Sequence, residues 1–193
     1  MKLRGLYAIT PEAPDAVEKV RRALEGGIAL LQYRRKRRDL HEARAIAALA
    51  RRHKVPLIVN DDVELALELG ADGAHLGRDD GELGAARRRL AGKILGASCY
   101  NDAELARRAI DAGADYVAFG SVFASPTKPS AVRAPLALFA AELPVPLCAI
   151  GGITLENAPS VIEAGADLLA VVSDLFDAPD IARRAAQYRK LFA

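Results

Sequence analysis

The stretch DAGADYVAFG (residues 111–120) decides the fold of this chain. It reads as a helix end, a Gly-Ala-Asp turn and a short apolar strand, and the same order returns in ELGADGAHLG (residues 68–77) and EAGADLLAVV (residues 163–172). A looser copy is LEGGIALLQYR (residues 24–34). Glycine ends a helix in the left-handed conformation at little cost, and short apolar runs are typical of strands buried on both faces. The repeat predicts a unit of helix, tight loop and parallel strand.

Eight apolar runs occur along the chain, with helical periodicity between nearly all of them. Eight strands alternating with eight helices favour either a closed barrel or an open doubly wound sheet. Even units with no GxGxxG or GxxxxGK[ST] motif after the first strand favour the barrel. We therefore predict one compact α/β domain over residues 1–193, a (β/α)8 TIM barrel. The runs are LYAI (6–9), ALLQY (29–33), PLIVN (56–60), GAHLG (73–77), ILGAS (94–98), YVAFG (116–120), PLCAI (146–150) and LLAVV (168–172).

Composition and charge exclude several classes of partner. Half of the residues are hydrophobic, and 27 basic residues nearly balance 25 acidic ones, which leaves no electrostatic footprint for nucleic acid. No apolar run approaches the length of a membrane span, and the first apolar stretch is too short for a signal peptide. We expect a cytoplasmic protein that acts on small molecules, with Cys99 and Cys148 as reduced structural thiols. The sequence does not predict an oligomeric state.

In a barrel of this kind the chemistry lies on the loops that follow the strands, and these loops are polar here. After the second strand, alternation places Gln32, Arg34 and Lys36 on one face, with two cations that converge on an anion, and turns Arg35 away. The alternative is a solvated basic turn. After the sixth strand, a loop rich in hydroxyl groups with one lysine suits a phosphate, although an ordinary polar loop has the same composition.

Acidic residues follow the third and fourth strands. Asp61 and Asp62 follow the third strand and Asp79 and Asp80 follow the fourth, so acidic groups lie at neighbouring strand ends. Two carboxylates close to cations are what Mg²⁺ carrying a polyphosphate requires. The alternative is that residues 60–62 and 79–80 cap the helices that follow them.

The last two strand ends predict a second anion site. Gly151-Gly152, before a helix expected to begin near Thr154, and Val172-Ser173 match the phosphate site that barrels often build from their seventh and eighth loops. The alternative for two glycines is a tight turn. His75 is interpreted as a packed strand histidine rather than a base, and no nucleophile with an adjacent base is found.

Seven motifs in one order, over almost the entire chain, resemble the thiamine phosphate synthase family: QYRRK, VNDD, GAHLGRDD, GASCYND, FGSVFASPTK, AIGGIT and AVVS. The resemblance implies the condensation of 4-amino-2-methyl-5-hydroxymethylpyrimidine diphosphate with 4-methyl-5-(2-phosphoethyl)thiazole, giving thiamine phosphate and diphosphate. It implies that the pyrimidine diphosphate is held by Gln32, Arg34, Lys36, Asn60, Ser98 and Lys128, of which Arg34, Lys36, Lys128 and Ser98 act in catalysis. It implies Mg²⁺ on Asp61 and Asp80, and a thiazole phosphate held by Ser125, Pro126, Thr127, Gly152, Val172 and Ser173.

The chain departs from the family pattern at a few positions. Arg78 stands where the family often has glutamine, Ser125 replaces a threonine, Arg35 replaces a common acidic residue, and Cys99-Tyr100 replaces a frequent His-Thr pair. None removes a charged ligand. Two alternatives remain open. A related thiazole tautomerase has a histidine where Ser121 stands, and a catalytically silent barrel that binds thiamine-type phosphates would have lost charged ligands.

Overall fold

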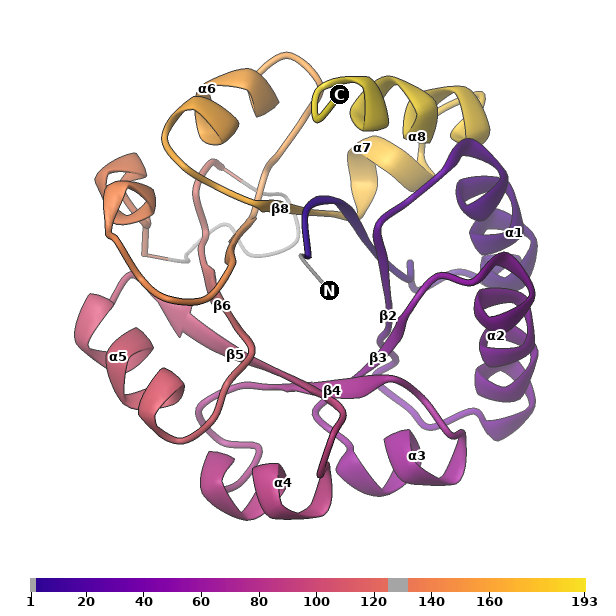
Figure 1. The fold of residues 1–193 in the computed structure, drawn as a ribbon. Helices are drawn as coiled ribbons and strands as arrows, with labels where there is room; N and C mark the ends of the chain where they lie inside the picture. The colour runs from indigo at the N-terminus through magenta and orange to yellow at the C-terminus, as the bar shows by residue number, and fades with distance from the viewer. Residues whose placement is uncertain (1–2, 125–131) are drawn as a thin grey trace.

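Eight parallel strands close into a barrel in chain order, β1 beside β2 and so on round to β8 beside β1 (Figure 1). The computed structural model describes residues 3–124 and 132–193. The predicted (β/α)8 barrel is thus confirmed. The strands are β1 (Gly5–Ile9), β2 (Leu30–Tyr33), β3 (Leu57–Asn60), β4 (Gly73–Leu76), β5 (Ile94–Tyr100), β6 (Tyr116–Phe119), β7 (Leu147–Ile150) and β8 (Leu168–Val171).

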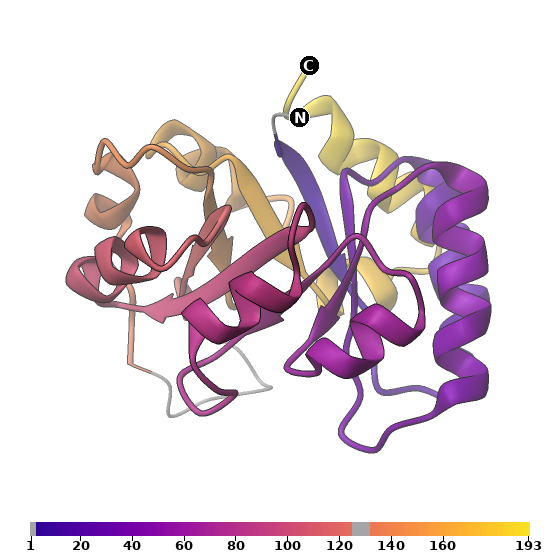
Figure 2. The ribbon, with the colours of Figure 1, turned by 60° about the horizontal axis from the view of Figure 1, so that its bottom comes forward.

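Helices surround the barrel as an outer ring (Figures 1 and 2). The α-helices of the described residues are α1 (Ala16–Gly26), α2 (Leu40–His53), α3 (Val63–Glu68), α4 (Leu83–Arg89), α5 (Ala103–Asp111), α6 (Ala158–Glu163), α7 (Ser173–Phe176) and α8 (Ile181–Lys190).

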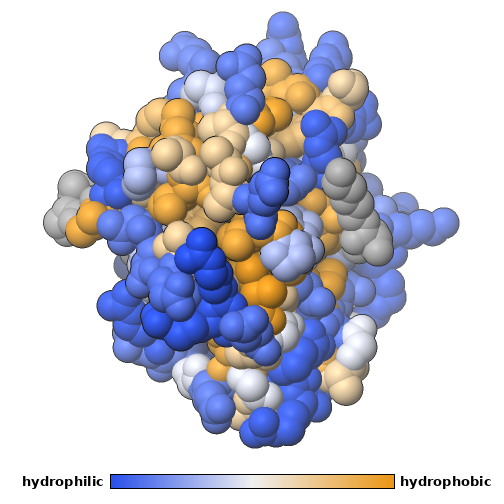
Figure 3. Space-filling view, turned by 60° about the vertical axis from the view of Figure 1, so that its left-hand side comes forward, coloured by the Kyte–Doolittle hydropathy of each residue, from blue (hydrophilic) through white to orange (hydrophobic). Residues whose placement is uncertain are grey.

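The prediction of one helix after each strand is wrong at two places. In the described part of the connection from β6 to β7, the helical turn is the 3₁₀ helix η1 (Leu136–Ala140), and β8 is followed by both α7 and α8. Pro144 and Pro146 stand between η1 and β7, and proline, which lacks an amide hydrogen, does not continue a helix. On the side of the barrel that carries α5, η1 and α6, apolar side chains lie among hydrophilic ones at the surface (Figure 3).

Two apolar layers form the core, one on each face of the strands. Along β1, Tyr7 and Ile9 point into the barrel, while Leu6 and Ala8 pack under the helices. This alternation is the period of two that a strand imposes on its side chains. The barrel is therefore filled by side chains, and the residues of the inner face are fixed by the register of the strands.

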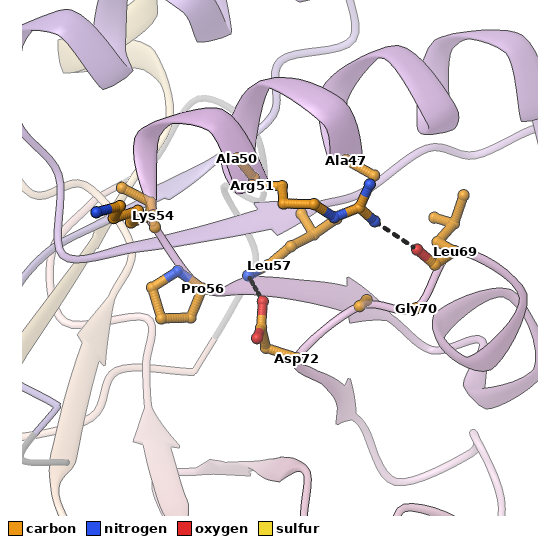
Figure 4. Close-up of a pocket in the computed structure, with 11 residues that line it drawn as sticks. Ala47, Ala50, Arg51, Lys54, Pro56, Leu57, Leu69, Gly70 and Asp72 are labelled. Carbon is orange, nitrogen blue, oxygen red and sulfur yellow. Dashed lines mark hydrogen bonds between the residues drawn. The ribbon is translucent and has the colours of Figure 1, made fainter.

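The aspartate of each Gly-Ala-Asp turn stands just before a strand and binds the start of the preceding strand. Its backbone N–H donates to the carbonyl of the first or second residue of that preceding strand, and its carboxylate accepts the N–H of the same residue. Figure 4 shows this contact for Asp72, beside a hollow of about 230 Å³ at the amino-terminal end of the barrel. The carboxylate oxygen to amide nitrogen distances are 2.8 Å for Asp72 to Leu57, 2.7 Å for Asp115 to Leu95 and 3.1 Å for Asp167 to Leu147.

The two cysteines are free thiols, as predicted, and both are buried. Burial raises the pKa of the Cys99 thiol to about 12 and that of Cys148 well above its usual range, so both stay protonated. No helix in the described segments is both long enough and apolar enough to span a membrane.

Asp72→Ala removes the acceptor for the Leu57 amide at the amino-terminal edge of the barrel. We expect the free energy of unfolding to fall by about 1–2 kcal/mol, because one backbone hydrogen bond to a carboxylate near solvent is lost. Urea unfolding followed by circular dichroism measures it. Asp177→Ala, which removes an exposed carboxylate after α7, is the matched control. Equal stability of both variants and the wild type would show that the repeated aspartate contributes no stability.

Candidate functional site

The carboxyl ends of the eight strands meet at one edge of the barrel, which is here called the mouth. Most of the predicted site residues lie at or just beyond these ends: Gln32, Arg34, Lys36, Asn60, Asp61, Asp80, Ser98, Gly152, Val172 and Ser173. Ser125, Pro126, Thr127 and Lys128 lie outside the described residues. The segments that reach the mouth are far apart in sequence, and barrel closure alone brings them to one edge.

The backbone of Arg34 is held by a buried side chain from the neighbouring strand. The Thr10 hydroxyl, just beyond β1, donates to the Arg34 carbonyl at 2.9 Å and accepts the Arg34 N–H at 2.9 Å. The Thr10 N–H donates to the carbonyl of Gln32 at 3.0 Å. Because Thr10 is 3% exposed, water does not compete for these bonds. The exit of β2 is therefore fixed where the predicted anion-binding loop begins.

Arg35 turns away from the mouth, as alternation predicts, and braces the same loop from outside. Its Nε donates to the Glu42 carboxylate of α2 at 2.6 Å and one terminal nitrogen donates to the Ala13 carbonyl at 2.7 Å. Glu12 accepts from a second terminal nitrogen of Arg35 at 3.3 Å and from the Lys36 N–H at 2.8 Å. The Arg35 and Glu42 side chains are only 13% and 11% exposed, so this ion pair is shielded from solvent. Arg35 thus ties Lys36 and α2 together.

A line of buried polar side chains crosses the barrel interior, and we call it the relay. It runs from Gln32 through Tyr7, Tyr116 and His75 to Ser98. The successive distances are 2.7 Å from Gln32 Nε2 to Tyr7 Oη, 2.7 Å from Tyr7 Oη to Tyr116 Oη, 2.9 Å from Tyr116 Oη to His75 Nδ1 and 2.8 Å from His75 Nε2 to Ser98 Oγ. The relay joins Gln32 and Ser98, two residues that the sequence predicts for one substrate.

His75 is a packed strand histidine, as the sequence indicates, and both of its ring nitrogens are hydrogen-bonded. Burial lowers the pKa of His75 to about 4, so the imidazole is neutral at pH 7. It therefore carries no positive charge into the barrel.

Sequence reasoning missed Tyr7 and Tyr116, which look like ordinary apolar strand residues. The available signal was that each stands at an inward position of its strand, where a tyrosine hydroxyl must find a partner. The pairing itself was not visible, because β1 and β6 lie on different sides of the barrel.

The carboxylates after β3 and β4 lie on adjacent connections, since Asn60 pairs with His75 in register. The capping residue of α3 is Asp62, whose carboxylate accepts the Leu65 N–H at 2.8 Å. Asp61 has left-handed backbone geometry, with φ of 64°, and its N–H donates to the His75 carbonyl at 2.8 Å. The capping alternative for this stretch is therefore met by Asp62.

Asp80 does not cap the next helix either, because the N-cap position of α4 is Glu82. The Asp80 carboxylate instead accepts the Gly77 N–H at 2.7 Å, which folds the loop after β4 back onto the strand end. Within the described segments there is no group of three or more His, Cys, Asp or Glu side chains placed to hold a metal. Two carboxylates on neighbouring loops suit Mg²⁺, which usually takes one or two carboxylates together with substrate phosphates.

The glycine pair after β7 has left-handed backbone geometry, with φ of 102° at Gly151 and 64° at Gly152. A Cβ on Gly152 would lie 2.3 Å from the carbonyl oxygen of Ala124, so a side chain is excluded by the protein itself. The sequence suggested that glycine is needed here so that a phosphate can approach the backbone. The packing of Gly152 against the chain after β6 already accounts for the glycine. A larger residue at Gly152 would disturb that chain and would not report on a ligand alone.

The helix expected near Thr154 begins four residues later, at Ala158. The Thr154 N–H donates to the Asn157 side-chain oxygen at 2.9 Å, and the Asn157 amide donates to the Gly152 carbonyl at 3.0 Å. These bonds favour a turn over a first helical turn. Val172 and Ser173 follow β8, the neighbour of β7, so they reach the mouth beside the glycine pair.

Two departures from the family pattern contact each other. The Arg78 guanidinium lies over the Tyr100 ring, 4.8 Å from its centroid, and the Arg78 N–H donates to the Tyr100 hydroxyl at 3.3 Å. Tyr100 follows a bulge in β5 after Ser98, and such a bulge re-aims the side chains at a strand end. The pair therefore joins the loop after β4, on which Asp80 lies, to the end of β5, in which Ser98 lies.

The profile of a family described as thiamine monophosphate synthase matches residues 6–175. A thiamine-phosphate synthase of Aromatoleum aromaticum is 63% identical, covering 99% of this chain and 97% of that protein, and one of Azoarcus sp. is 54% identical, covering 100% and 98%. A solved structure of thiamine phosphate pyrophosphorylase from Pyrococcus furiosus aligns with a TM-score of 0.87 at 34% identity, covering 98% of this chain and 96% of that one. The chain belongs to the thiamine monophosphate synthase family.

Proposed function

We propose that this thiamine-phosphate synthase of thiamine biosynthesis carries out its condensation with Mg²⁺ and releases diphosphate. The pyrimidine diphosphate and the thiazole phosphate would bind at opposite sides of the mouth. The observation that carries the proposal is the gathering of Arg34, Lys36, Asp61 and Asp80 at adjacent strand ends on one edge of the barrel. Cations and carboxylates in this combination suit a metal-bound diphosphate. The buried, unpaired thiols fit a reducing compartment such as the cytoplasm.

The reaction needs no base. The bond between the exocyclic carbon and the diphosphate oxygen breaks with its electron pair, and the electron-rich aminopyrimidine stabilises the cation left on that carbon. The thiazole nitrogen then donates its lone pair to form the new carbon–nitrogen bond, and no proton is lost. A site for this chemistry stabilises the leaving group, holds the two rings in line and excludes water.

The residues of the chain divide these tasks. Arg34 and Lys36 would bind the departing diphosphate, and Lys128 would add a third cation. The Thr10 hydroxyl fixes the backbone of Arg34, and Arg35 fixes that of Lys36 through Glu12. Asp61 and Asp80 would hold Mg²⁺, which neutralises charge on the diphosphate oxygens. Gly152, Val172 and Ser173 would hold the thiazole phosphate beside Ser125, Pro126 and Thr127.

The tautomerase alternative is not favoured, because its chemistry needs a side chain that transfers protons. Ser121 stands at the position of the histidine of that relative, and its hydroxyl donates to the Phe123 carbonyl at 2.7 Å. The catalytically silent alternative predicts lost charges, whereas Arg34, Lys36, Asp61 and Asp80 are all retained.

The metal prediction is tested by Asp61→Asn, assayed for diphosphate release with both substrates, with and without EDTA. We expect turnover to fall on the order of 10²-fold in the variant, because one Mg²⁺ ligand loses its charge. Stability should change little, since asparagine tolerates left-handed geometry and Asp62 caps α3. Asp79→Asn is the matched control. Release that persists undiminished in EDTA would overturn the metal assignment.

The thiazole phosphate site is tested by Ser173→Ala. We expect the KM for the thiazole phosphate to rise about tenfold, because a hydrogen bond to a charged group is lost, and the KM for the pyrimidine diphosphate to stay constant. Steady-state kinetics with each substrate varied in turn measures the two values. Ser160→Ala, which removes an exposed hydroxyl from α6, is the control. A rise in both KM values together would argue against a separate thiazole site.

The brace by Arg35 is tested by Arg35→Met and Glu42→Gln, singly and together. Each variant frees the loop that carries Lys36, so we expect the KM for the pyrimidine diphosphate to rise about tenfold, with the double variant no worse than either single variant. Arg37→Met, in the same exposed turn, controls for the loss of a positive charge near the mouth. Equal effects of Arg35→Met and Arg37→Met would mean that charge alone matters.

A further inference from the structure

We propose that the relay has a single direction, and that this direction presents Ser98 to the pyrimidine diphosphate as a hydrogen-bond donor. Tyr7, Tyr116 and His75 would then be positioning residues that act through Ser98. The identity of the ligand rests on the proposed function. The direction of the relay is a property of the protein and can be measured without substrate.

The direction follows from counting donors and acceptors along the relay. The Gln32 amide turns its Nε2 toward Tyr7, and because this nitrogen can only donate, the Tyr7 oxygen accepts at that contact. The Tyr7 hydrogen is then left for the Tyr116 oxygen, at 2.7 Å. Tyr116 in turn donates to His75 Nδ1, at 2.9 Å.

The count ends at the mouth. Because Nδ1 of His75 accepts, the ring proton lies on Nε2, which donates to the Ser98 oxygen at 2.8 Å. The Ser98 oxygen is thus engaged as an acceptor, and its own hydrogen is directed elsewhere. The His75 bond is the one that the structure gives for the Ser98 hydroxyl within the described residues.

Burial keeps water from replacing any of these donors or acceptors. The exposed fractions are 1% for Tyr7, 0% for Tyr116 and 3% for Gln32, so each hydroxyl hydrogen must be used within the relay. None of the fully buried side-chain nitrogen and oxygen atoms in the described part of the chain lacks a partner. Reversing the relay would require the Gln32 amide to turn over, so that its Oε1 accepts from Tyr7 in place of Nε2 donating to it.

The rings are held in place by their packing. Tyr116 stacks on His75 at a centroid distance of 5.5 Å and meets Tyr7 edge-on at 5.8 Å. Gly96 leaves the space for this arrangement, because a Cβ there would lie 2.2 Å from the Tyr116 ring. This packing keeps the two hydroxyl groups and the imidazole within hydrogen-bond distance of one another.

A donor at Ser98 selects what it can meet on the substrate. Its partner must be an acceptor, which a diphosphate oxygen or a pyrimidine ring nitrogen provides and the exocyclic amine, a donor, does not. The relay thus connects the Gln32 side of the mouth to the orientation of one hydroxyl on the β5 side.

The direction is tested first by ¹⁵N NMR of the imidazole rings in the substrate-free protein. The chain has three histidines, and His75→Gln identifies the signals of His75. We expect a neutral His75 with a protonated Nε2 and an unprotonated Nδ1. In Tyr116→Phe, Nδ1 loses its donor, and we expect the tautomer equilibrium to move toward a protonated Nδ1. A protonated Nδ1 in the wild type would overturn the proposal.

The connection to Ser98 is tested by kinetics. We expect Tyr116→Phe to lower kcat/KM for the pyrimidine diphosphate about tenfold, without changing the KM for the thiazole phosphate. In a Ser98→Ala background the same substitution should not lower kcat/KM further, because the Ser98 hydroxyl that the relay orients is already missing. An equal loss in both backgrounds would show that Tyr116 acts through general stability and would overturn the positioning role.

Tyr188→Phe is the matched control, because it also removes a buried tyrosine hydroxyl, bonded to Asp174 at 2.7 Å on the outside of the barrel. It should leave both the His75 tautomer and the kinetics unchanged. If Tyr116→Phe does not fold, the His75 tautomer of the wild type still decides the direction of the relay. If no variant or wild type turns over substrate, the proposed function fails, while the NMR result still decides the direction of the relay.

Discussion

Three carboxylates at the amino-terminal edge of the barrel, those of Asp72, Asp115 and Asp167, each accept an N–H at the start of the preceding strand. Each contact fixes how a pair of strands begins, and in a parallel sheet that start sets the register of the whole pair. A slip of one residue would turn every inward side chain outward. The contents of the barrel interior, and therefore the groups that line its mouth, depend on these starting contacts.

Register explains why a buried polar line can exist in a barrel filled with Leu, Ile and Val. Tyr7 and Tyr116 occupy inward positions, and Gln32, His75 and Ser98 occupy the inward positions nearer the mouth. An isolated hydroxyl there would cost free energy, whereas a complete line of partners avoids that cost. The same constraint makes the line vulnerable, since removing any member leaves its neighbours without a partner. The interior is thus mostly apolar, and the relay crosses it toward the mouth.

The sequence was sufficient for the barrel because strand length, apolar runs and the Gly-Ala-Asp turn are local signals. It was insufficient where the outcome depends on contacts between distant segments. The partners of Arg35 are Glu12, Ala13 and Glu42. The contact between Arg78 and Tyr100 joins the loop after β4 to the end of β5, and the sequence shows these two residues only as separate departures from the family pattern. The start of α6 moved to Ala158 because side-chain bonds around Asn157 compete with the first helical turn.

The predicted ligands lie at one edge because the barrel closes, and no single motif places them there. For this reason the motifs were informative as an ordered set, whereas each motif alone could also be a helix cap, a tight turn or a polar loop. The structure decides the capping alternative for both acidic stretches, since Asp62 caps α3 and the N-cap position of α4 is Glu82.

The histidine beside this site illustrates how environment decides chemistry. An imidazole near a reacting centre is usually suspected as a base, yet His75 uses Nδ1 on Tyr116 and Nε2 on Ser98, and burial keeps it neutral. A neutral ring whose two nitrogens are both hydrogen-bonded cannot take a proton from a substrate without breaking a hydrogen bond of the relay. A condensation in which the nucleophilic nitrogen has no proton to lose makes no such demand. The site can therefore place a histidine next to Ser98 and use it only to orient a hydroxyl.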